Sequence, residues 1–489
     1  MTPFIAELIK MPEGKTLEFK RDLSSPKNFI KTLVAFANSA GGRLIFGVEN
    51  ESRIPIGIEN PLDEEERLCN IIADAIEPRI VPNIEMFTVE AKTLLMVEVF
   101  LSPSRPHSIK SEGLQGVYVR LGSTNRLADR ELIAELKRST LGIAFDELPL
   151  PEFRIDALDL NAIQALFSNK KQIKEETLLT LKLLTRAQSH LVPTIGGLLL
   201  FGGKTREMRF SDVWIQCGRF IGMSKADIFD HVEIYEHLPV AVERVMEFLK
   251  KHAMRSADFS DIRRKDIWSI PLNIIREAVI NAIVHADYSQ IGAPIRVALF
   301  DNRIEIESPG TLLPGLTIED ICKGVSKLRN KVISRIFREL GLIEQWGSGI
   351  PRIFKEAEEL GLPKPEIVEI GMRVRFIIYL KQLSVIKSQP ESQPESQPES
   401  QPESQPESQP ESQPESLENR ILELLISAPL SKTDISKRLG QKEVSGQLNK
   451  VIRKLLDNLL IEYTIPDKPN SRLQKYRLSN SSKIKEKIE

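Results

Sequence analysis

The sequence has few of the residues that cross-link small secreted proteins or anchor membrane proteins. Only three cysteines occur among 489 residues, and Cys69, Cys217 and Cys322 are too far apart to form a metal or disulfide pattern. No apolar run approaches a membrane span, and the N-terminus lacks the basic-then-apolar layout of a signal peptide. These absences exclude a disulfide scaffold, predict no membrane partner, and favour a reducing, cytoplasmic location.

A large excess of either charge is also missing. The chain has 67 Lys and Arg against 68 Asp and Glu, a net charge of −1, which argues against coating by nucleic acid over the whole surface. Hydrophobic content of 41% and charged content of 28% are typical of a soluble globular protein, and the length predicts two or three domains. Charge is unevenly placed, because residues 417–489 hold 15 Lys and Arg against 9 Asp and Glu.

A P-loop is absent as well. The stretch PTIGGLLLFGGKT (Pro193 to Thr205) ends in Gly-Lys-Thr, but the first glycine of a P-loop would have to stand where Leu198 stands. We therefore predict a core strand here rather than a phosphate site. Without a P-loop, helicase motor activity is not expected.

What the sequence does contain is a chemically suggestive helix, IREAVINAIVHADYS (Ile275 to Ser289). Glu277, Asn281 and His285 follow at steps of four, so their side chains share one face of a helix that is otherwise largely apolar. A carboxylate can polarise a water molecule, and an amide oxygen can ligate Mg²⁺. The alternative is an exposed polar stripe without function.

This segment resembles the N-box of the GHKL ATPases. With VALFDNRIEIESPGTL, GVSKLRNKVISRIF and GLIEQWGSGIPRIF, it more closely resembles the divergent C-terminal domain of proteins labelled RecG-like ATP-dependent DNA helicases or transcriptional regulators. The resemblance implies ATP and Mg²⁺ as cofactors, Glu277 as general base and Asn281 as metal ligand, with weak ATPase activity as an open alternative. Ser308 stands where GHKL proteins carry the Asp that binds adenine, and Arg329 with Asn330 would lie in a lid loop. The remaining residues of the implied nucleotide site are His285, Asp287, Gly310, Gly347, Ser348 and Gly349.

LEFK, AFANSAGGRLIFGV and YVRLGSTNRLA, between Glu13 and Leu136, resemble the AlbA-like domain shared with Schlafen proteins. The resemblance implies nucleic-acid binding, with Arg43, Arg120 and Arg126 as phosphate contacts. It also leaves an alternative function, a metal-dependent endoribonuclease using Glu13, Glu18 and Lys20. A simpler interpretation is that Glu18 and Lys20 form a surface ion pair on a strand.

Seven Ser-Gln-Pro-Glu repeats (residues 388–415) bury nothing and predict an extended, disordered tether. The following pattern of three helices and a hairpin resembles a winged helix, in which the third helix enters the DNA major groove. Its expected nucleic-acid contacts are Gln447, Lys450, Lys454, Lys468, Arg472 and Lys475.

Together these features predict a multidomain α/β (α+β) protein. The expected domains are an AlbA/Schlafen-like domain (1–145), a helical connector (146–191), a GHKL-like α/β sandwich (192–384), a linker (385–416), a winged helix-turn-helix (417–480) and a charged tail (481–489). We expect a homodimeric or larger DNA-binding regulator controlled by nucleotide, with RNA as an alternative partner.

Overall fold

A computed structural model defines the fold in two compact units, Met1–Ile386 and Lys387–Glu489. It describes residues 7–50, 52–167, 173–253, 270–343 and 349–380, and the backbone of 255–258 and 265–268. In the second unit it describes residues 421–422, 424–425, 429–439, 448, 451–452, 455–456, 460–464 and 475–479. The predicted linker and charged tail lie outside these ranges.

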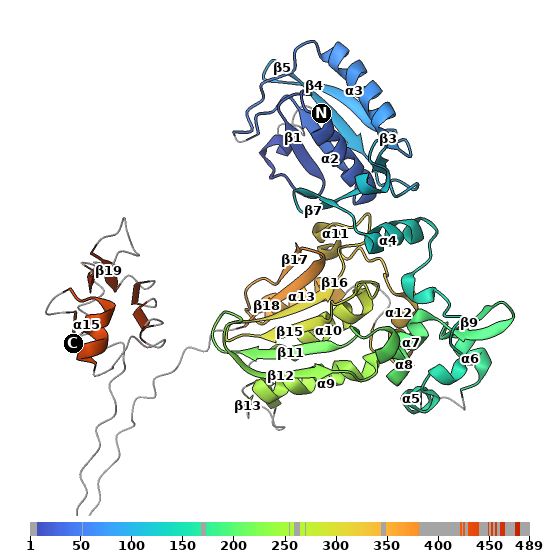
Figure 1. The fold of residues 1–489 in the computed structure, drawn as a ribbon, viewed down its shortest axis with the longest axis vertical. Coiled ribbons are helices and arrows are strands. Elements are labelled where there is room, and N and C mark those ends of the chain that lie inside the picture. The colour runs from blue at the N-terminus through green and yellow to red at the C-terminus, as the bar shows by residue number, and fades with distance from the viewer. Residues whose placement is uncertain are drawn as a thin grey trace, which may run out of the picture. The chain divides into compact units, whose positions relative to one another are not determined.

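The first domain is a four-stranded sheet with two helices on one face (Figure 1). The strand order is β1 (Leu17–Lys20), β2 (Gly42–Phe46), β5 (Lys92–Val99) and β4 (Asn83–Val89), with only the β1–β2 pair parallel. Helices α2 (Pro26–Asn38) and α3 (Pro61–Ala75) bury their apolar residues against β2 and β5. After α2 the chain reverses at Gly41, whose φ of +76° suits glycine, and a Cβ there would lie 2.7 Å from the Val99 carbonyl oxygen.

Two small two-stranded sheets and one helix accompany this sheet. Strands β3 (Ile76–Glu77) and β6 (Ser108–Ile109) pair with each other, as do β7 (Tyr118–Leu121) and β8 (Thr124–Leu127). Helix α4 (Arg130–Thr140) begins where the Asp129 carboxylate accepts a hydrogen bond from the Leu132 amide. Figure 1 shows α4 between the sheet of the first domain and the larger second domain.

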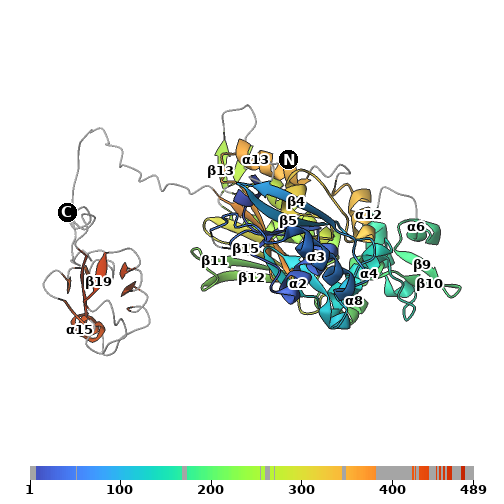
Figure 2. The ribbon, with the colours of Figure 1, turned by 90° about the horizontal axis from the view of Figure 1, so that it is seen from above.

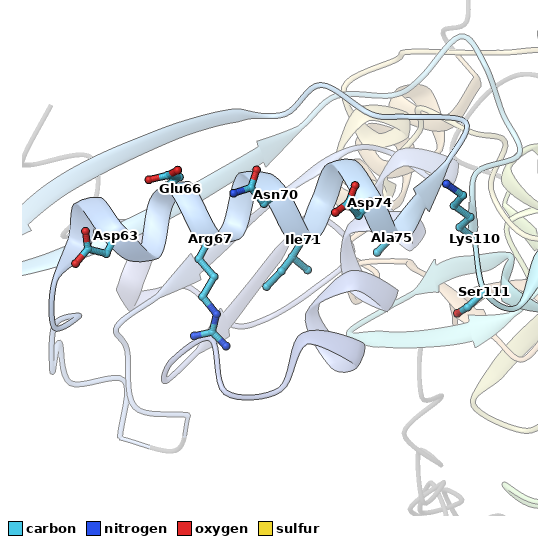
Figure 3. Close-up of a pocket in the computed structure, with 9 residues that line it drawn as sticks. All are labelled: Asp63, Glu66, Arg67, Asn70, Ile71, Asp74, Ala75, Lys110 and Ser111. Carbon is cyan, nitrogen blue, oxygen red and sulfur yellow. The ribbon is translucent and has the colours of Figure 1, made fainter.

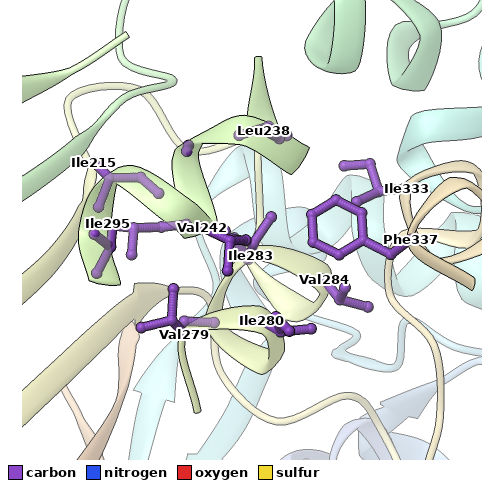
Figure 4. Close-up of a cluster of buried hydrophobic side chains, with 14 of the residues drawn as sticks. Ile215, Leu238, Val242, Val279, Ile280, Ile283, Val284, Ile295, Ile333 and Phe337 are labelled. Carbon is purple, nitrogen blue, oxygen red and sulfur yellow. The ribbon is translucent and has the colours of Figure 1, made fainter. Parts of the chain in front are cut away.

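The second domain is built on a six-stranded sheet in the order β12-β11-β15-β16-β18-β17. Its inner face alternates apolar residues with period two, and α9 (Leu238–His252) and α10 (Leu272–His285) pack into the core against it (Figure 4). Helix α10 is apolar around most of its circumference, which is the pattern of a buried helix. The strands are β11 (Ile215–Phe220), β12 (Ile228–Ile234), β15 (Ile295–Leu299), β16 (Arg303–Pro309), β17 (Glu366–Ile370) and β18 (Arg373–Tyr379).

Three further helices and a hairpin complete this domain: α11 (Ile318–Cys322), α12 (Lys331–Glu339), α13 (Gly349–Glu359), and β13 (Arg255–Asp258) with β14 (Lys265–Trp268). Phe337 and Ile333 of α12 reach the same core as α10 (Figure 4). Residues 295–308 form an antiparallel hairpin, and the apolar spacing from Lys331 forms an amphipathic helix, as local alternation and helical periodicity indicate.

Residues 146–191, expected to be a helical connector, also contain a hairpin. Helices α5 (Leu160–Leu166) and α6 (Glu175–Thr180) precede β9 (Leu184–Ala187) and β10 (His190–Pro193), which lie beside them in Figures 1 and 2. Their apolar side chains, including Ile163 and Leu178, belong to the hydrophobic core of the six-stranded sheet. The segment is therefore part of the second domain's packing.

The strand predicted at residues 193–205 is wrong. The chain forms helices α7 (Ile195–Phe201) and α8 (Gly203–Arg209), and Thr194 caps α7 by accepting a hydrogen bond from the Gly197 amide. A Cβ on Gly197 would lie 2.3 Å from the Leu183 carbonyl oxygen. These glycines therefore permit close packing of a buried helix, which a short apolar run cannot distinguish from a buried strand.

The first and second domains contact each other through several polar groups. Lys15 forms an ion pair of 2.8 Å with Glu369, the Gly315 amide donates to the Ser39 carbonyl at 2.6 Å, and Arg329 pairs with Glu135 of α4. The Arg329 and Glu135 side chains are only 6% and 10% exposed. The contact is therefore a buried, charge-specific junction.

The second unit has its own small core. Helix α15 (Lys432–Arg438) is preceded by its N-cap Ser431, which forms a capping box with Asp434. Strands β19 (Ile461–Tyr463) and β20 (Tyr476–Leu478) pair antiparallel, and Leu430 bridges to Tyr476 as a third strand position. Leu448, Ile452 and Leu455 are buried in this core.

Candidate functional site

The polar face of α10 forms one wall of a cavity of about 380 Å³. Glu277, Asn281 and His285 all line it, together with Ser308 of β16 and Gly349 of α13. The floor is apolar and includes Ile306 and Phe376, which are paired across β16 and β18. With Arg329, which also lines it, the structure brings together six of the residues that the resemblance assigned to a nucleotide site, in a cavity of the size that binds small molecules.

Glu277 is held from two sides. The Asn281 amide donates to its carboxylate at 3.3 Å, and Arg352 of α13 donates to the other oxygen at 2.9 Å. A Cβ on Gly349 would lie 2.2 Å from Oε1 of Glu277, so only glycine lets α13 begin this close to α10. Gly347 and Ser348, predicted for the same loop, lie outside the described residues.

Positive charge dominates the cavity lining. Lys327, Arg329, Arg338 and Arg352 line it, while Glu277 supplies the one carboxylate among the described lining residues. Within the same set, Oγ of Ser334 is buried and has no hydrogen-bond partner. Lys327, Arg338 and Ser334 were missed by sequence reasoning because their spacing carries no signal without the fold.

Arg329 and Asn330, expected in a lid loop, are both buried and bonded, and Arg329 lines the cavity. Arg329 pairs with Glu135, lies 3.7 Å from Asp287 and donates to the Thr311 carbonyl. Asn330 donates to the Val284 and Ala286 carbonyls at 2.9 and 2.7 Å, which ties down the C-terminus of α10.

Asp287 and Gly310 lie outside the cavity and support its wall. Asp287 is buried, accepts hydrogen bonds from Ser289 at 2.6 Å and lies beside Arg329. Gly310 has a φ of +100°, and a Cβ there would lie 2.8 Å from Cβ of Asp287. Neither residue lines the cavity, so both position its wall instead of facing its contents.

Two titratable groups with shifted pKa values lie at the end of α10 and beside the start of α12. Burial, with the Arg329 cation nearby, lowers the pKa of His285 to about 4, so its imidazole is neutral at pH 7. Asp146 accepts hydrogen bonds from the Lys331, Val332 and Ile333 amides at the start of α12. Burial nevertheless raises the pKa of Asp146 to about 7, and sequence reasoning did not single this residue out.

The donor set of the cleft fits a magnesium-bound polyanion. Donation by Asn281 Nδ2 to Glu277 leaves the amide oxygen of Asn281 as a ligand for a hard cation. Cationic side chains and the buried Ser334 hydroxyl can receive anionic and hydrogen-bonding groups. Ser308 lines the cavity without a carboxylate, so a charge-assisted bond to an adenine amino group is not available at this position.

The acidic residues of the first domain do not fit a metal-dependent nuclease. Glu18 is buried and pairs with both Arg120 and Lys20, and its Oε1 also accepts from Thr32 at 3.2 Å. Glu13 is engaged by the Phe19 amide at 2.9 Å. No group of three or more His, Cys, Asp or Glu in the described ranges is arranged to hold a metal ion. The ion pair of Glu18 and Lys20 exists, but Glu18 is not on the surface as that interpretation required.

The expected phosphate contacts of the first domain separate in the structure. Arg120 is 3% exposed and committed to Glu18, so it cannot reach a phosphate in this arrangement. Arg43 is 37% exposed and paired with Glu98 at 2.6 Å, whereas Arg126 is exposed on β8. Figure 3 shows an open depression along α3 that carries Asp63, Glu66 and Asp74 as well as Lys110, a mixture that does not favour a phosphate backbone.

Most predicted nucleic-acid contacts of the second unit cannot be placed. Gln447, Lys450, Lys454, Lys468 and Arg472 lie outside the described residues. Lys475 is exposed at the start of β20, where its backbone amide donates to the Thr464 hydroxyl at 3.2 Å. Across the described part of the chain, none of the helices is long and apolar enough to cross a membrane.

Three family models match separate segments of the chain. Residues 13–129 match "Schlafen, AlbA_2", residues 292–378 match "Putative ATP-dependent DNA helicase recG C-terminal", and residues 418–479 match "Filamentation induced by cAMP protein Fic-like, C-terminal domain". The first two confirm both family resemblances, although α10 itself precedes the second match. The third model is not described as a winged helix.

Two solved structures show weaker overall likeness. The DIP2311 protein from Corynebacterium diphtheriae is 19% identical over 77% of this chain and 79% of its own, with a TM-score of 0.39. The N-terminal domain of a "Putative ATP-dependent DNA Helicase RecG-related Protein" from Nitrosomonas europaea is 28% identical over 26% of this chain and 91% of its own, with a TM-score of 0.22. No curated protein matches the sequence.

Fold and matches together define a multidomain α+β protein with a nucleic-acid-related function. Its first domain is similar to Schlafen AlbA_2 domains, and its second domain to the ATPase-like C-terminal domain of RecG-labelled proteins.

Proposed function

We propose that the protein is a nucleic-acid-binding regulator, acting in transcription as a dimer, in which a Mg-nucleotide bound on α10 controls engagement of DNA. The observation that carries the proposal is the cationic cavity of about 380 Å³ with Glu277 and Asn281 on one wall. The amide oxygen of Asn281 would hold Mg²⁺, while Lys327, Arg338 and Arg352 would receive the phosphates.

Glu277 is the proposed general base, but its carboxylate is bonded to Arg352. Arg352 would therefore have to leave Glu277, for example toward a phosphate, before that carboxylate could accept a proton. This arrangement favours nucleotide binding as the primary role of the cleft. Nucleotide hydrolysis would require Arg352 to move away from Glu277 first.

DNA binding is assigned to the second unit. Its capped helix α15, the buried residues of the following helix and the β19–β20 hairpin support a winged helix. The Leu430–Tyr476 bridge adds a third strand position to that hairpin, as the wing of such a domain requires. The exposed Arg126 of β8 is the best-placed contact for nucleic acid in the first domain.

Calorimetric titration of the full chain with Mg-ATP and Mg-GTP tests the cleft. We expect Asn281→Ala to weaken Mg-dependent binding about tenfold, which is the loss of one metal ligand or charge-assisted contact. The matched control is Asn273→Ala, which removes an exposed amide of the same helix that does not line the cavity. Equal binding by both variants, or no binding by the wild type, would disprove the nucleotide assignment.

Fluorescence anisotropy on duplex DNA tests the regulatory step. Saturating Mg-nucleotide should change the apparent Kd of the wild type severalfold and leave the Kd of Asn281→Ala unchanged. Glu277→Gln should retain binding and lose any hydrolysis. A nucleotide effect that persists in Asn281→Ala would place control elsewhere.

A further inference from the structure

A second cavity, of about 190 Å³, lies at the junction of the first and second domains. Arg105, Arg138 and Ser139 line it from the first domain, and the segments 313–314 and 327–331 line it from the second. Leu313, Lys327, Leu328 and Arg329 line both this cavity and the cleft on α10. The two cavities thus share a wall.

The charges around this junction cavity do not cancel. Five cationic side chains line it against two carboxylates, Glu135 and Asp287, and both carboxylates are directed to the buried Arg329. Lys331 has its own partner in Glu147 at 3.4 Å. Among the described residues, the remaining three cations, Arg105, Arg138 and Lys327, form no ion pair.

The hydrogen bonds of these three cations go to uncharged groups. Arg105 donates to the Ser102 carbonyl and to the Ser139 hydroxyl at 3.1 Å, and its buried Nε has no acceptor in the described part of the chain. Lys327 donates to the Pro314 carbonyl at 2.8 Å. Arg138 lies 5.2 Å over the ring of Phe145, which leaves the edge of its guanidinium available.

Burial disfavours the charged forms of these three cations. Burial lowers the pKa of both Arg105 and Arg138, and burial together with repulsion from Arg105 lowers the pKa of Lys327. Each shift means that the surroundings disfavour the cationic form, a penalty that a bound anion would offset.

We propose that this junction cavity binds a phosphate-type anion, held by Arg105, Arg138 and Lys327 across the two domains. Its volume is too small for a whole nucleotide and suits a short chain of phosphate groups. The source is a small oligophosphate or the terminal phosphate of a nucleic-acid strand. The proposal does not depend on the nucleotide cleft, which is assayed with other ligands.

The test uses the full chain and inorganic tripolyphosphate, titrated calorimetrically in EDTA so that the magnesium-dependent cleft does not contribute. We expect Arg105→Gln with Arg138→Gln to weaken binding about tenfold or more for each lost arginine contact. The charge-matched control is Arg209→Gln with Arg244→Gln, two exposed arginines of the second domain that line neither cavity. Arg105→Lys with Arg138→Lys keeps the charge and should retain most of the affinity.

Repeating the titration in Arg338→Gln separates this cavity from the cleft, because Arg338 lines the cleft alone and binding at the junction should be unchanged there. If the glutamine pair does not unfold cooperatively on heating, the single variant Arg138→Gln replaces it. Arg138 is one of the three proposed anion contacts and lines the junction cavity but not the cleft, and about tenfold weaker binding is expected from loss of its charge-assisted contact.

Two further arms identify the source of the phosphate. A 5′-phosphorylated hexathymidylate that binds more tightly than its unphosphorylated form, with the gain lost in the glutamine pair, indicates a strand terminus. Binding of tripolyphosphate alone, lost in the same variant, indicates a small oligophosphate. Equal tripolyphosphate affinity in the wild type, the glutamine pair and the control, or no binding at all, would overturn the proposal.

Discussion

Replacement of Arg329 by methionine probes the junction between the domains most directly. The guanidinium is buried between Glu135, Asp287 and the Thr311 carbonyl, with 5–10% exposure for the two carboxylate side chains. Arg329→Met removes the cation and leaves two buried carboxylates without their partner. Breaking a buried pair in this way costs about 3–5 kcal/mol of unfolding free energy.

Urea unfolding of the full chain, monitored by circular dichroism, measures this loss of unfolding free energy in the unfolding transition of the first unit. The matched control is Lys323→Met, which removes a cation from an exposed i,i+4 pair with Glu319 and should leave the urea midpoint unchanged. Glu135→Gln combined with Arg329→Met should recover part of the loss, because one unpaired carboxylate is then neutral.

The pH dependence of the unfolding free energy is the measurement that can refute this argument. Burial raises the pKa of Glu135, and removal of Arg329 must raise it further. A carboxylate with a raised pKa in the folded state destabilises only above its unfolded pKa of about 4. The deficit of Arg329→Met should therefore be largest at pH 7 and shrink as the pH falls toward 4. A deficit equal to that of Lys323→Met, or one independent of pH, would refute the buried-junction argument.

Three further outcomes are expected. Because burial lowers the pKa of His285 to about 4, the unfolded state binds its proton first as the pH falls from 6.5 to 4. Stability should then fall by at most about 3 kcal/mol over that window, and this part of the acid dependence should be missing from His285→Asn in parallel melts at several pH values. Gly349→Ala places a Cβ 2.2 Å from the Glu277 carboxylate and should weaken nucleotide binding about tenfold in calorimetry, whereas Gly14→Ala, with open space around it, should not. A chain ending at Ser416 should lose most duplex-DNA affinity by anisotropy, and unchanged affinity would move the DNA contact to the first domain.

Sequence periodicity was sufficient to predict the helices and strands that bury a single face. The hairpin at residues 295–308, the helix from Lys331 and the Ser431 cap all follow local rules of alternation, helical spacing and capping. It failed for residues 195–201, because a buried helix and a buried strand are both continuous apolar runs. The glycines of this run permit close packing, since a Cβ on Gly197 would lie 2.3 Å from the Leu183 carbonyl oxygen.

The residues of the candidate site also fall into those that local sequence rules can predict and those that they cannot. Glu277 and Asn281 could be predicted because their spacing of four on one helix is a local property. The roles of Arg120 and Arg329 could not, since each is decided by a carboxylate far away in the sequence, Glu18 and Glu135. A basic residue in a loop looks the same in the sequence whether it meets a phosphate or a buried acid.

The position of Arg329 also limits how a signal can pass through the molecule. Its side chain is bonded to α4 of the first domain, to the turn after β16 and to the loop after α10, and it lines both cavities. A ligand can shift a conformational equilibrium only by its differential affinity for the two states. An anion at the junction and a nucleotide in the cleft would both contact the wall that the two cavities share. Binding of either ligand would therefore alter the protein's affinity for the other by the same factor. Loss of Arg329 should remove that coupling even if both ligands still bind, because the shared wall would no longer connect the two domains.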